Sequence, residues 1–352
     1  MENTLIHGKT GLGKTTGYMF NKVTEMIEHH ENLIIVDEKK EYFRTFGKEL
    51  KEEGYKTLVI NLDEAEKSNG FNILELPYSL YQRNKKDLSL RILTLIYKEL
   101  LFNKNDKEDS FWVNAAANYL VGLTILLFQN GSKKEINLGS VYVLMMEYER
   151  KSYDKLKSYL ESISVTNSLY AYLSVTILAP VYTRGGIIAT AKERMSLYIG
   201  SDSILNLLCQ NDISLNNLET PYALFIFNNE DYSGIANTIL DEIFLHLKNY
   251  NLILDNADDL NKLSKLDYCL ENNQINQVNT YYISRDKEDL VTKYSKNTLN
   301  KFSNIIDLEK GQIVTRKIGD YTYFPSLSNS KNVYINPQKI KLNQKRLDTR
   351  FF

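Results

Sequence analysis

The chain has 352 residues, of which 43 are Lys or Arg and 44 are Asp or Glu, so its formal net charge is −1. A nearly neutral chain is not a general polycation, and nucleic acid would have to bind a local basic patch. The two cysteines, Cys209 and Cys269, are far apart and form no CxxC pair, which argues against a structural zinc site and favours a reducing, cytoplasmic setting. The best apolar run, residues 119–128, has about half the length that a membrane-spanning helix needs.

The first 60 residues alternate between strand and helix patterns. Strands are predicted at 3–7, 33–36 and 57–60. Helices are predicted at 14–30 and 41–53. Continuous apolar strands are typical of a parallel sheet that helices cover. This order therefore predicts an α/β nucleotide-binding core.

Helix patterns alone follow from residue 80 to residue 177. The amphipathic stretches are 86–102, 109–129, 137–149 and 152–162. They predict an all-α lobe inserted into the α/β core, and a run of covering helices without a separate lobe is the alternative. Trp112, on the apolar face of one predicted helix, is expected in the core.

The α/β pattern resumes near residue 180. Strands are predicted at 222–227, 252–254, 280–283 and 305–308, a helix at 232–249, and a hairpin at 313–317 and 321–324. We therefore expect a nucleotide-binding core of residues 1–79 and 178–330, an inserted all-α domain of residues 80–177, and a basic polar tail of residues 331–352.

The segment GKTGLGKT, residues 8–15, fits the phosphate-binding pattern G-x-x-x-x-G-K-[ST] at every fixed position. In this pattern backbone N–H groups surround the phosphates, the lysine (Lys14) reaches the β- and γ-phosphates, and the hydroxyl of Thr15 completes the Mg²⁺ shell. The helix that follows points its positive end at the anion. The predicted nucleotide-binding residues are Gly8, Lys9, Thr10, Gly11, Leu12, Gly13, Lys14, Thr15 and Thr16. A glycine-rich turn without a ligand is the alternative.

An acidic residue at the end of an apolar strand is the second expected part of such a site. It would end a strand beside the strand of the phosphate loop and hold Mg²⁺ through water. Asp37 and Asp255 both end apolar strands. Either residue would serve equally as a helix cap or turn residue, and the pattern alone does not choose between them.

Several segments, in their order along the chain, carry a resemblance to a known family. VDEKKEYF (36–43) resembles the DPKGE segment of the type IV coupling proteins of conjugation and type IV secretion, the TraG/TraD group within the FtsK/HerA-like motor ATPases. FWVNAAANYLVGL (111–123) is similar to the Trp-containing helix of their all-α domain, and LILDNADDLNKLSKL (252–266) resembles their second acidic motif. Residues 54–74 and 183–198 resemble their third strand and the segment that re-enters the core. The similarity covers nearly the whole chain.

This resemblance implies a RecA-like P-loop core with a mainly parallel sheet and an inserted all-α lobe, which binds ATP and Mg²⁺. It assigns Lys14 and Asp255 to catalysis, and Thr15 and Asp255 to the metal. It gives Asp37 a structural or inter-subunit role instead of a metal one.

The chain also departs from the family pattern where water is activated. Asn256 stands where the catalytic glutamate is expected, and Asp258 is a candidate substitute. The arginine expected shortly afterwards is absent from residues 270–277. Arg285, near the expected sensor position, and Arg184 are the remaining candidate arginines, and a surface role is the alternative for both.

The resemblance predicts a motor ATPase of a conjugative or type IV secretion DNA-transfer apparatus. Its expected partners are single- or double-stranded DNA, further copies of itself in a hexameric ring, and relaxase or secretion-channel proteins. Lys85-Lys86, Lys133-Lys134 and the basic tail are candidate DNA contacts, with solvated surface as the alternative. A nucleotide-binding scaffold with little or no hydrolysis is the second hypothesis, because of Asn256. A kinase or GTPase is a third, disfavoured possibility, since the chain shows no acceptor-binding signature.

Coupling proteins of this type usually carry transmembrane helices before the phosphate loop, whereas this chain begins at the loop. A fragment, a soluble variant and a degenerate relative are the interpretations that remain open. The expected location is the cytoplasm, at the inner face of the membrane if partners or a missing N-terminal anchor hold the protein there.

Overall fold

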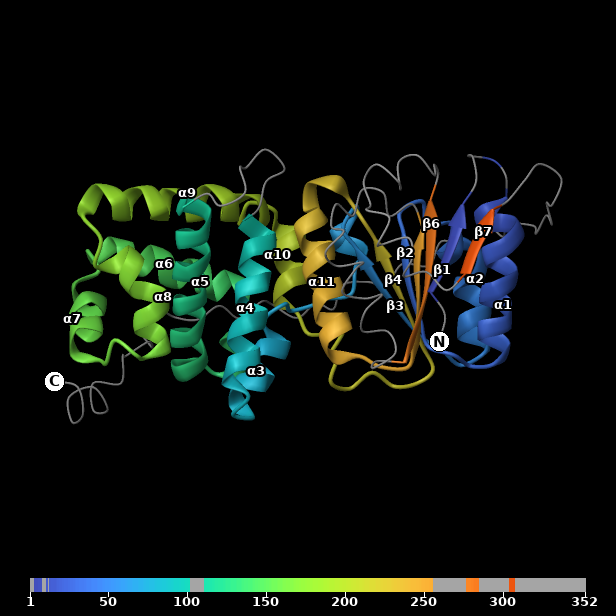
Figure 1. Cartoon of the computed structure of the whole chain (residues 1–352), viewed down its shortest axis with the longest axis horizontal. Helices are drawn as coiled ribbons and strands as arrows, with labels where there is room; N and C mark the ends of the chain where they lie inside the picture. Colours follow the sequence, from blue (N-terminus) through green and yellow to red (C-terminus); the bar gives the residue numbers. More distant parts are fainter. Residues whose placement is uncertain are drawn as a thin grey trace. The chain divides into compact units, whose positions relative to one another are not determined.

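The computed structural model describes residues 3–7, 11, 13–101, 111–255, 277–284 and 304–307, and the chain forms two compact units (Figure 1). The sheet unit is built from the chain before residue 70 and after residue 214. The helical unit is built from residues 70–214.

The sheet unit contains one sheet of seven described strands. They are β1 (Asn3–His7), β2 (Leu33–Asp37), β3 (Lys56–Asn61), β4 (Tyr222–Phe227), β5 (Tyr250–Asp255), β6 (Val278–Ser284) and β7 (Asn304–Asp307). Their order in the sheet is β3-β4-β2-β5-β6-β1-β7, and every strand pair is parallel. The predicted strands are present with ends shifted by at most two residues, and the predicted hairpin lies outside the described residues. The parallel sheet confirms the α/β prediction.

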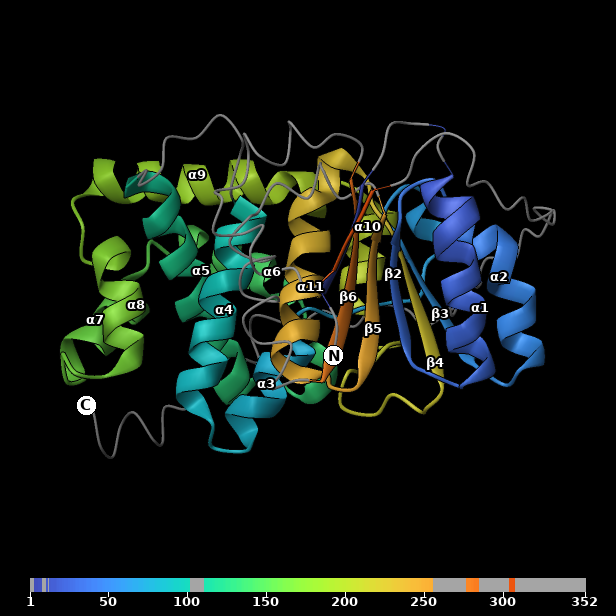
Figure 2. The same cartoon turned by 45° about the vertical axis from the view of Figure 1, so that its right-hand side comes forward.

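Helices cover both faces of this sheet. Helices α1 (Phe20–Glu28) and α2 (Glu41–Glu52) lie on one face, and α11 (Ser233–His246) lies on the other (Figures 1 and 2). Because all strands are parallel, their carboxyl ends lie along one edge, where ligands bind in open α/β sheets.

The sequence of α2 fixes both its orientation and its end. Its buried residues, Tyr42, Phe43, Phe46, Gly47 and Leu50, fall on one side of the helix. The ring of Phe43 meets the rings of Phe225 and Phe227 on β4 edge to face, with centroids 5.2 and 5.5 Å apart. Gly54, at φ +78°, ends the helix by donating its N–H to the carbonyl of Lys51 at 3.1 Å. This packing holds the first turn of α2 at the carboxyl edge of the sheet.

The described part of the helical unit contains helices and no strands. They are α3 (Glu75–Gln82), α4 (Lys86–Leu101), α5 (Phe111–Asn130), α6 (Leu138–Arg150), α7 (Asp154–Ser162), α8 (Ser168–Ile177), α9 (Val181–Ile199) and α10 (Asp202–Cys209). Helix α5 is long and apolar enough to cross a membrane, but 72% of its apolar window is buried, as in a core helix. Helices α8 and α9 together pass the same test of length and composition, although they bend by 108° at their junction.

Three observations in this unit differ from the sequence predictions. The α/β pattern was expected to resume near residue 180, but α9 and α10 continue the helical unit to Ser214, because α9 packs against α4, α5 and α8. The unit also begins at Gly70 and not at residue 80. Trp112 is not in the core: it is 43% exposed, and its ring lies against Gly186 of α9.

Candidate nucleotide-binding site

The phosphate loop lies between β1 and α1, as its sequence predicts, and four of its predicted residues lie outside the described part of the chain. These are Gly8, Lys9, Thr10 and Leu12. Gly11 and Gly13 have φ angles of +85° and +79°, which L side chains rarely adopt, so this backbone path depends on glycine. A π-helical segment, Lys14–Met19, follows and leads into α1. The carbonyl of Gly13 accepts the N–H groups of both Gly17 and Tyr18, at 2.8 and 3.1 Å. The predicted helix therefore begins with a π-helical segment instead of an α-helical turn.

A cavity of about 210 Å³ opens at this loop. It is lined by Gly11, Gly13, Lys14, Thr15, Thr16, Glu38, Lys39, Glu41, Asp255 and Ile283. The structure therefore brings together the described members of the predicted loop and Asp255. Glu38, Lys39 and Glu41 were not predicted as site residues. Their signal in the sequence was a charged segment directly after an apolar strand, and the carboxyl end of such a strand is where ligands bind in open α/β sheets.

Asp255 reaches the phosphate loop from a strand that is not its neighbour. The hydroxyl of Thr15 donates to Oδ2 of Asp255 at 3.1 Å. Asp255 was expected to end a strand beside β1, but β6 lies between β1 and β5. The expected adjacency is wrong because strand order depends on long-range pairing, which a local apolar pattern does not encode. The contact between Thr15 and Asp255 forms nevertheless, because Thr15 lies after the phosphate loop and not on β1.

Burial shapes the charges of the site. Burial raises the pKa of Asp255 to about 6, the hydrogen bond from Thr15 lowers it, the negative charge of Glu41 raises it, and the positive charge of Lys39 lowers it. Lys14 is only 8% exposed and lines the same cavity. The cavity is therefore lined by a buried lysine, three acidic residues (Glu38, Glu41 and Asp255) and the hydroxyl-bearing Thr15 and Thr16.

Asp37 is buried behind the cavity and holds the start of α2. Its Oδ1 accepts the N–H of Glu41 at 2.8 Å, and its Oδ2 accepts the N–H of Phe43 at 2.9 Å. Burial raises the pKa of Asp37 to about 7, the hydrogen bond from Phe43 lowers it, and the charge of Asp255 raises it further. Both oxygens are therefore committed to the backbone of α2, which is a structural role.

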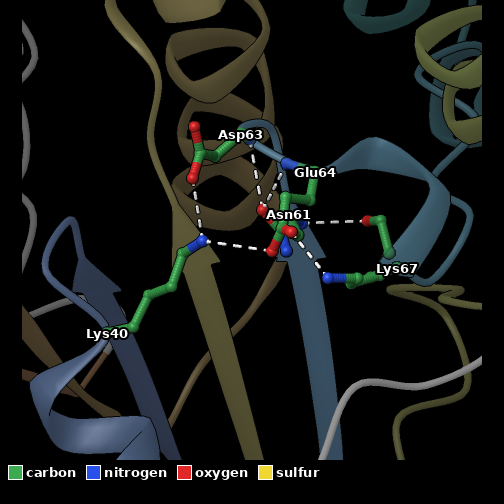
Figure 3. Close-up of polar contacts among 6 residues, drawn as sticks. Lys40, Asn61, Asp63, Glu64 and Lys67 are labelled. Carbon is green, nitrogen blue, oxygen red and sulfur yellow. Dashed lines mark hydrogen bonds and ion pairs between the residues drawn. The ribbon is translucent and has the colours of Figure 1, made fainter. Parts of the chain in front are cut away.

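The turn between β2 and α2 is tied to the loop after β3 by a charged network (Figure 3). Nζ of Lys40 lies 2.8 Å from Oδ2 of Asp63, 3.6 Å from Oε2 of Glu64 and 5.5 Å from the centre of the Phe227 ring. Lys67 pairs with the other oxygen of Glu64 at 2.6 Å. Lys40 itself has φ +59°, a left-handed conformation that is uncommon outside glycine. The network holds this turn beside the cavity.

The oxygen groups of the cavity suit Mg²⁺. Mg²⁺ prefers oxygen ligands and is usually held by one or two carboxylates, waters and substrate phosphates. Thr15 and Asp255 would hold it, and the raised pKa of Asp255 shows a buried carboxylate that a nearby cation would stabilise. Among the described residues no group of three or more His, Cys, Asp or Glu side chains could hold a metal ion by itself.

The other candidate residues of the sequence lie elsewhere. Asn256, Asp258 and Arg285 are outside the described residues. Arg184 donates through Nη1 to the carbonyls of Ile177 and Ala179, so it caps the end of α8. The lysine pairs 85–86 and 133–134 are exposed on the helical unit, and the basic tail is not described.

The family model described as "Type IV secretory system Conjugative DNA transfer" matches residues 2–270. Comparison with curated protein sequences gives no match. The fold is similar to VirB4 of Thermoanaerobacter pseudethanolicus, with a TM-score of 0.57 at 12% identity over 88% of this chain and 77% of that chain.

It is also similar to two structures of the bacterial conjugative coupling protein TrwB. The form in complex with sulphate gives a TM-score of 0.54 at 16% identity over 87% of this chain and 70% of that one. The complex with ADP and Mg²⁺ gives 0.52 at 16% identity over 86% and 69%. These likenesses show a RecA-like P-loop fold. The chain belongs to the type IV secretory system conjugative DNA transfer family, which confirms its resemblance to the type IV coupling proteins.

Proposed function

We propose that this protein is an ATP-binding, Mg²⁺-dependent motor ATPase of a conjugative or type IV secretion DNA-transfer apparatus. The observation that carries the proposal is the cavity where Lys14, Thr15 and Asp255 meet at the carboxyl edge of a parallel sheet. Bound nucleotide in related folds supports it, since TrwB structures hold ADP with Mg²⁺ and an ATP analogue. Lys14 would bind the β- and γ-phosphates, and Thr15 with Asp255 would hold Mg²⁺.

The proposed assembly is a hexameric ring that couples hydrolysis to the movement of single- or double-stranded DNA. Family membership supports DNA and secretion-apparatus partners, including a relaxase or channel proteins. The proposed location is the cytoplasmic face of the membrane, reached through such partners.

Hydrolysis of Mg-ATP tests this proposal, measured with and without single-stranded and double-stranded DNA. Lys14→Ala removes the buried lysine of the cavity, and Lys22→Ala is the matched control, because Lys22 lies on the following helix, outside the cavity. We expect DNA-stimulated turnover in the wild type and Lys22→Ala, and none in Lys14→Ala. Binding is read by thermal unfolding, since a ligand at 100 times its Kd stabilises the folded state by about 2.7 kcal/mol. Absence of both binding and turnover would refute the proposal.

A second candidate is a nucleotide-locked scaffold subunit, which Asn256 favours. An amide cannot accept a proton from the attacking water as a carboxylate does. Binding without turnover in the wild type, together with turnover in Asn256→Glu, would support the scaffold and exclude the autonomous motor.

A further inference from the structure

Hydrolysis by this chain needs a carboxylate that position 256 does not supply. Asn256 stands where the resemblance expects the catalytic glutamate. General base catalysis by a positioned carboxylate typically contributes about 10²- to 10⁴-fold to a rate, and an amide lacks the basic oxygen. Another acid would therefore supply the base if the proposed ATPase turns over at an ordinary rate: Asp258, which lies outside the described residues, or an acid that lines the cavity.

The described acids at or behind the cavity differ in what they are free to do. Asp255 accepts the Thr15 hydroxyl and is placed to hold Mg²⁺. Asp37 is 1% exposed and does not line the cavity, and its two oxygens accept backbone N–H groups. Glu38 and Glu41 remain, one on each side of the turn between β2 and α2.

Glu41 combines a fixed backbone with an available side chain. It is the first residue of α2, its N–H bonds to Asp37 at 2.8 Å, and its carbonyl accepts the hydroxyl of Thr45 at 2.8 Å. Its carboxylate makes no hydrogen bond or ion pair among the described residues, whereas Glu38 has a polar partner. Glu41 and Asp255 line the same cavity, together with Lys14 and Thr15.

The network around Lys40 supports this placement. Lys40 directly precedes Glu41, and its ion pairs to Asp63 and Glu64 join the turn to the loop after β3 (Figure 3). The Asp37 carboxylate also holds the turn, because its Oδ1 accepts the N–H of Glu41 at 2.8 Å. A general base must lie within about 2.6–3.2 Å of the proton that it takes, or reach it through one water, so a fixed turn is required.

We propose that Glu41 is the general base that replaces the glutamate missing at position 256. This inference rests on the proposed ATPase function. The oxygen of a cavity water forms a bond to the γ-phosphorus while the bond from that phosphorus to the bridging oxygen of the β-phosphate breaks. Glu41 takes one proton from the attacking water, and the bridging oxygen leaves with its electron pair on ADP. The proton then passes from Glu41 to the released phosphate or to solvent, which restores the carboxylate.

The test compares Glu41→Gln with the wild type, using Mg-ATP and the full chain. Glu49→Gln is the matched control, because it makes the same change on α2 two turns away from the cavity. We expect turnover of Glu41→Gln to fall by about 10²- to 10⁴-fold, while Glu49→Gln keeps the wild-type rate. The shift in melting temperature with a non-hydrolysable ATP analogue should stay the same in all three proteins. Nucleotide extracted from Glu41→Gln after incubation should remain ATP, whereas the wild type should yield ADP.

Each other outcome overturns the inference. If the wild type hydrolyses ATP and Glu41→Gln is equally active, Glu41 is not the general base, while the proposed ATPase function still stands. Loss of turnover in Glu38→Gln, with Glu41→Gln active, would assign the base to Glu38. A wild type that binds ATP without hydrolysing it refutes the motor proposal and the inference together. If Glu41→Gln does not fold, Glu41→Asp is used, which keeps a carboxylate but withdraws it by one methylene. A folded Glu41→Asp with the full wild-type rate also contradicts the proposal.

Discussion

The carboxylates of Asp37, which is buried, and Asp255, which is partly buried, indicate that the nucleotide-free protein loses stability as pH rises from 5 to 7. The pKa of Asp37 is raised from 3.8 to about 7 and that of Asp255 from 3.8 to about 6, both mainly by burial. A raised pKa means that the folded protein still binds a proton at pH values where the unfolded chain has released it. The stabilisation is therefore complete below about pH 4 and is lost as pH rises through the folded-state pKa.

The magnitude follows from linkage. One additional proton bound by the folded state changes the free energy of unfolding by about 1.4 kcal/mol per pH unit. Asp37 alone should therefore lower the stability of the sheet unit by roughly 2 to 3 kcal/mol between pH 5 and pH 7, and Asp255 adds to this loss up to about pH 6. Replacing Asp37 by Asn removes one titrating group, so the variant should show a shallower dependence, whatever its absolute stability.

Urea unfolding at several pH values between 5 and 7 measures this, with EDTA and without nucleotide. Circular dichroism is the suitable probe, because the single tryptophan, Trp112, lies in the helical unit. Asp87→Asn is the control, since it removes an exposed carboxylate in the helical unit. Parallel pH profiles for the wild type and Asp37→Asn would refute the reasoning, because Asp37 would then titrate alike in the folded and unfolded states.

Three further predictions concern packing and the turn beside the cavity. Gly122→Ala places a Cβ 2.4 Å from Leu173 and should destabilise the helical unit by about 1–3 kcal/mol. Its control, Gly185→Ala, meets no atom within 4 Å and should stabilise the unit by about 0.5–1 kcal/mol. Urea unfolding measures both free energies, and equal effects of the two substitutions would contradict the clash with Leu173. Phe43→Ala should cost about 3–5 kcal/mol in the same assay, and a loss below 1 kcal/mol would show that the sheet core closes around the gap. Lys40→Met should cost only about 0.2–1 kcal/mol of stability yet reduce ATP turnover. Unchanged turnover would show that the ion pairs of Lys40 do not influence the cavity.

Local patterns predicted much of the sheet unit because its strands are buried on both sides. Leu33, Ile34, Ile35 and Val36 form a continuous apolar run, and that run is β2 without a shift at its start. The phosphate loop could be predicted equally well, because its glycines, lysine and threonine lie within one short segment of the sequence. What the sequence pattern could not supply was pairing between distant segments. The insertion of β6 between β1 and β5 depends on strand register across the whole sheet.

The end of the helical unit was missed for a related reason. The segment 183–198 was matched to a return into the core, but its sequence has small and charged residues that fit a helix packed on other helices. The apolar face of its predicted helix places Trp112 in the core. Trp112 lies in the N-terminal turn of α5, however, and there its side chain is covered only in part. Periodicity identifies the buried side of a helix and not how much of its length a neighbour covers.

The turn between β2 and α2 shows how a local conformation can be kept when its usual residue is absent. Lys40 stands where the DPKGE segment has glycine, and it keeps φ at +59°. A non-glycine residue in this conformation costs about 1–2 kcal/mol, and such strain persists where surrounding contacts over-determine it. Those contacts are present, because Asp63, Glu64 and the ring of Phe227 hold the ammonium group. The side chain that replaces glycine therefore supplies the interactions that fix its own strained backbone. The residue directly after it, Glu41, lines the cavity.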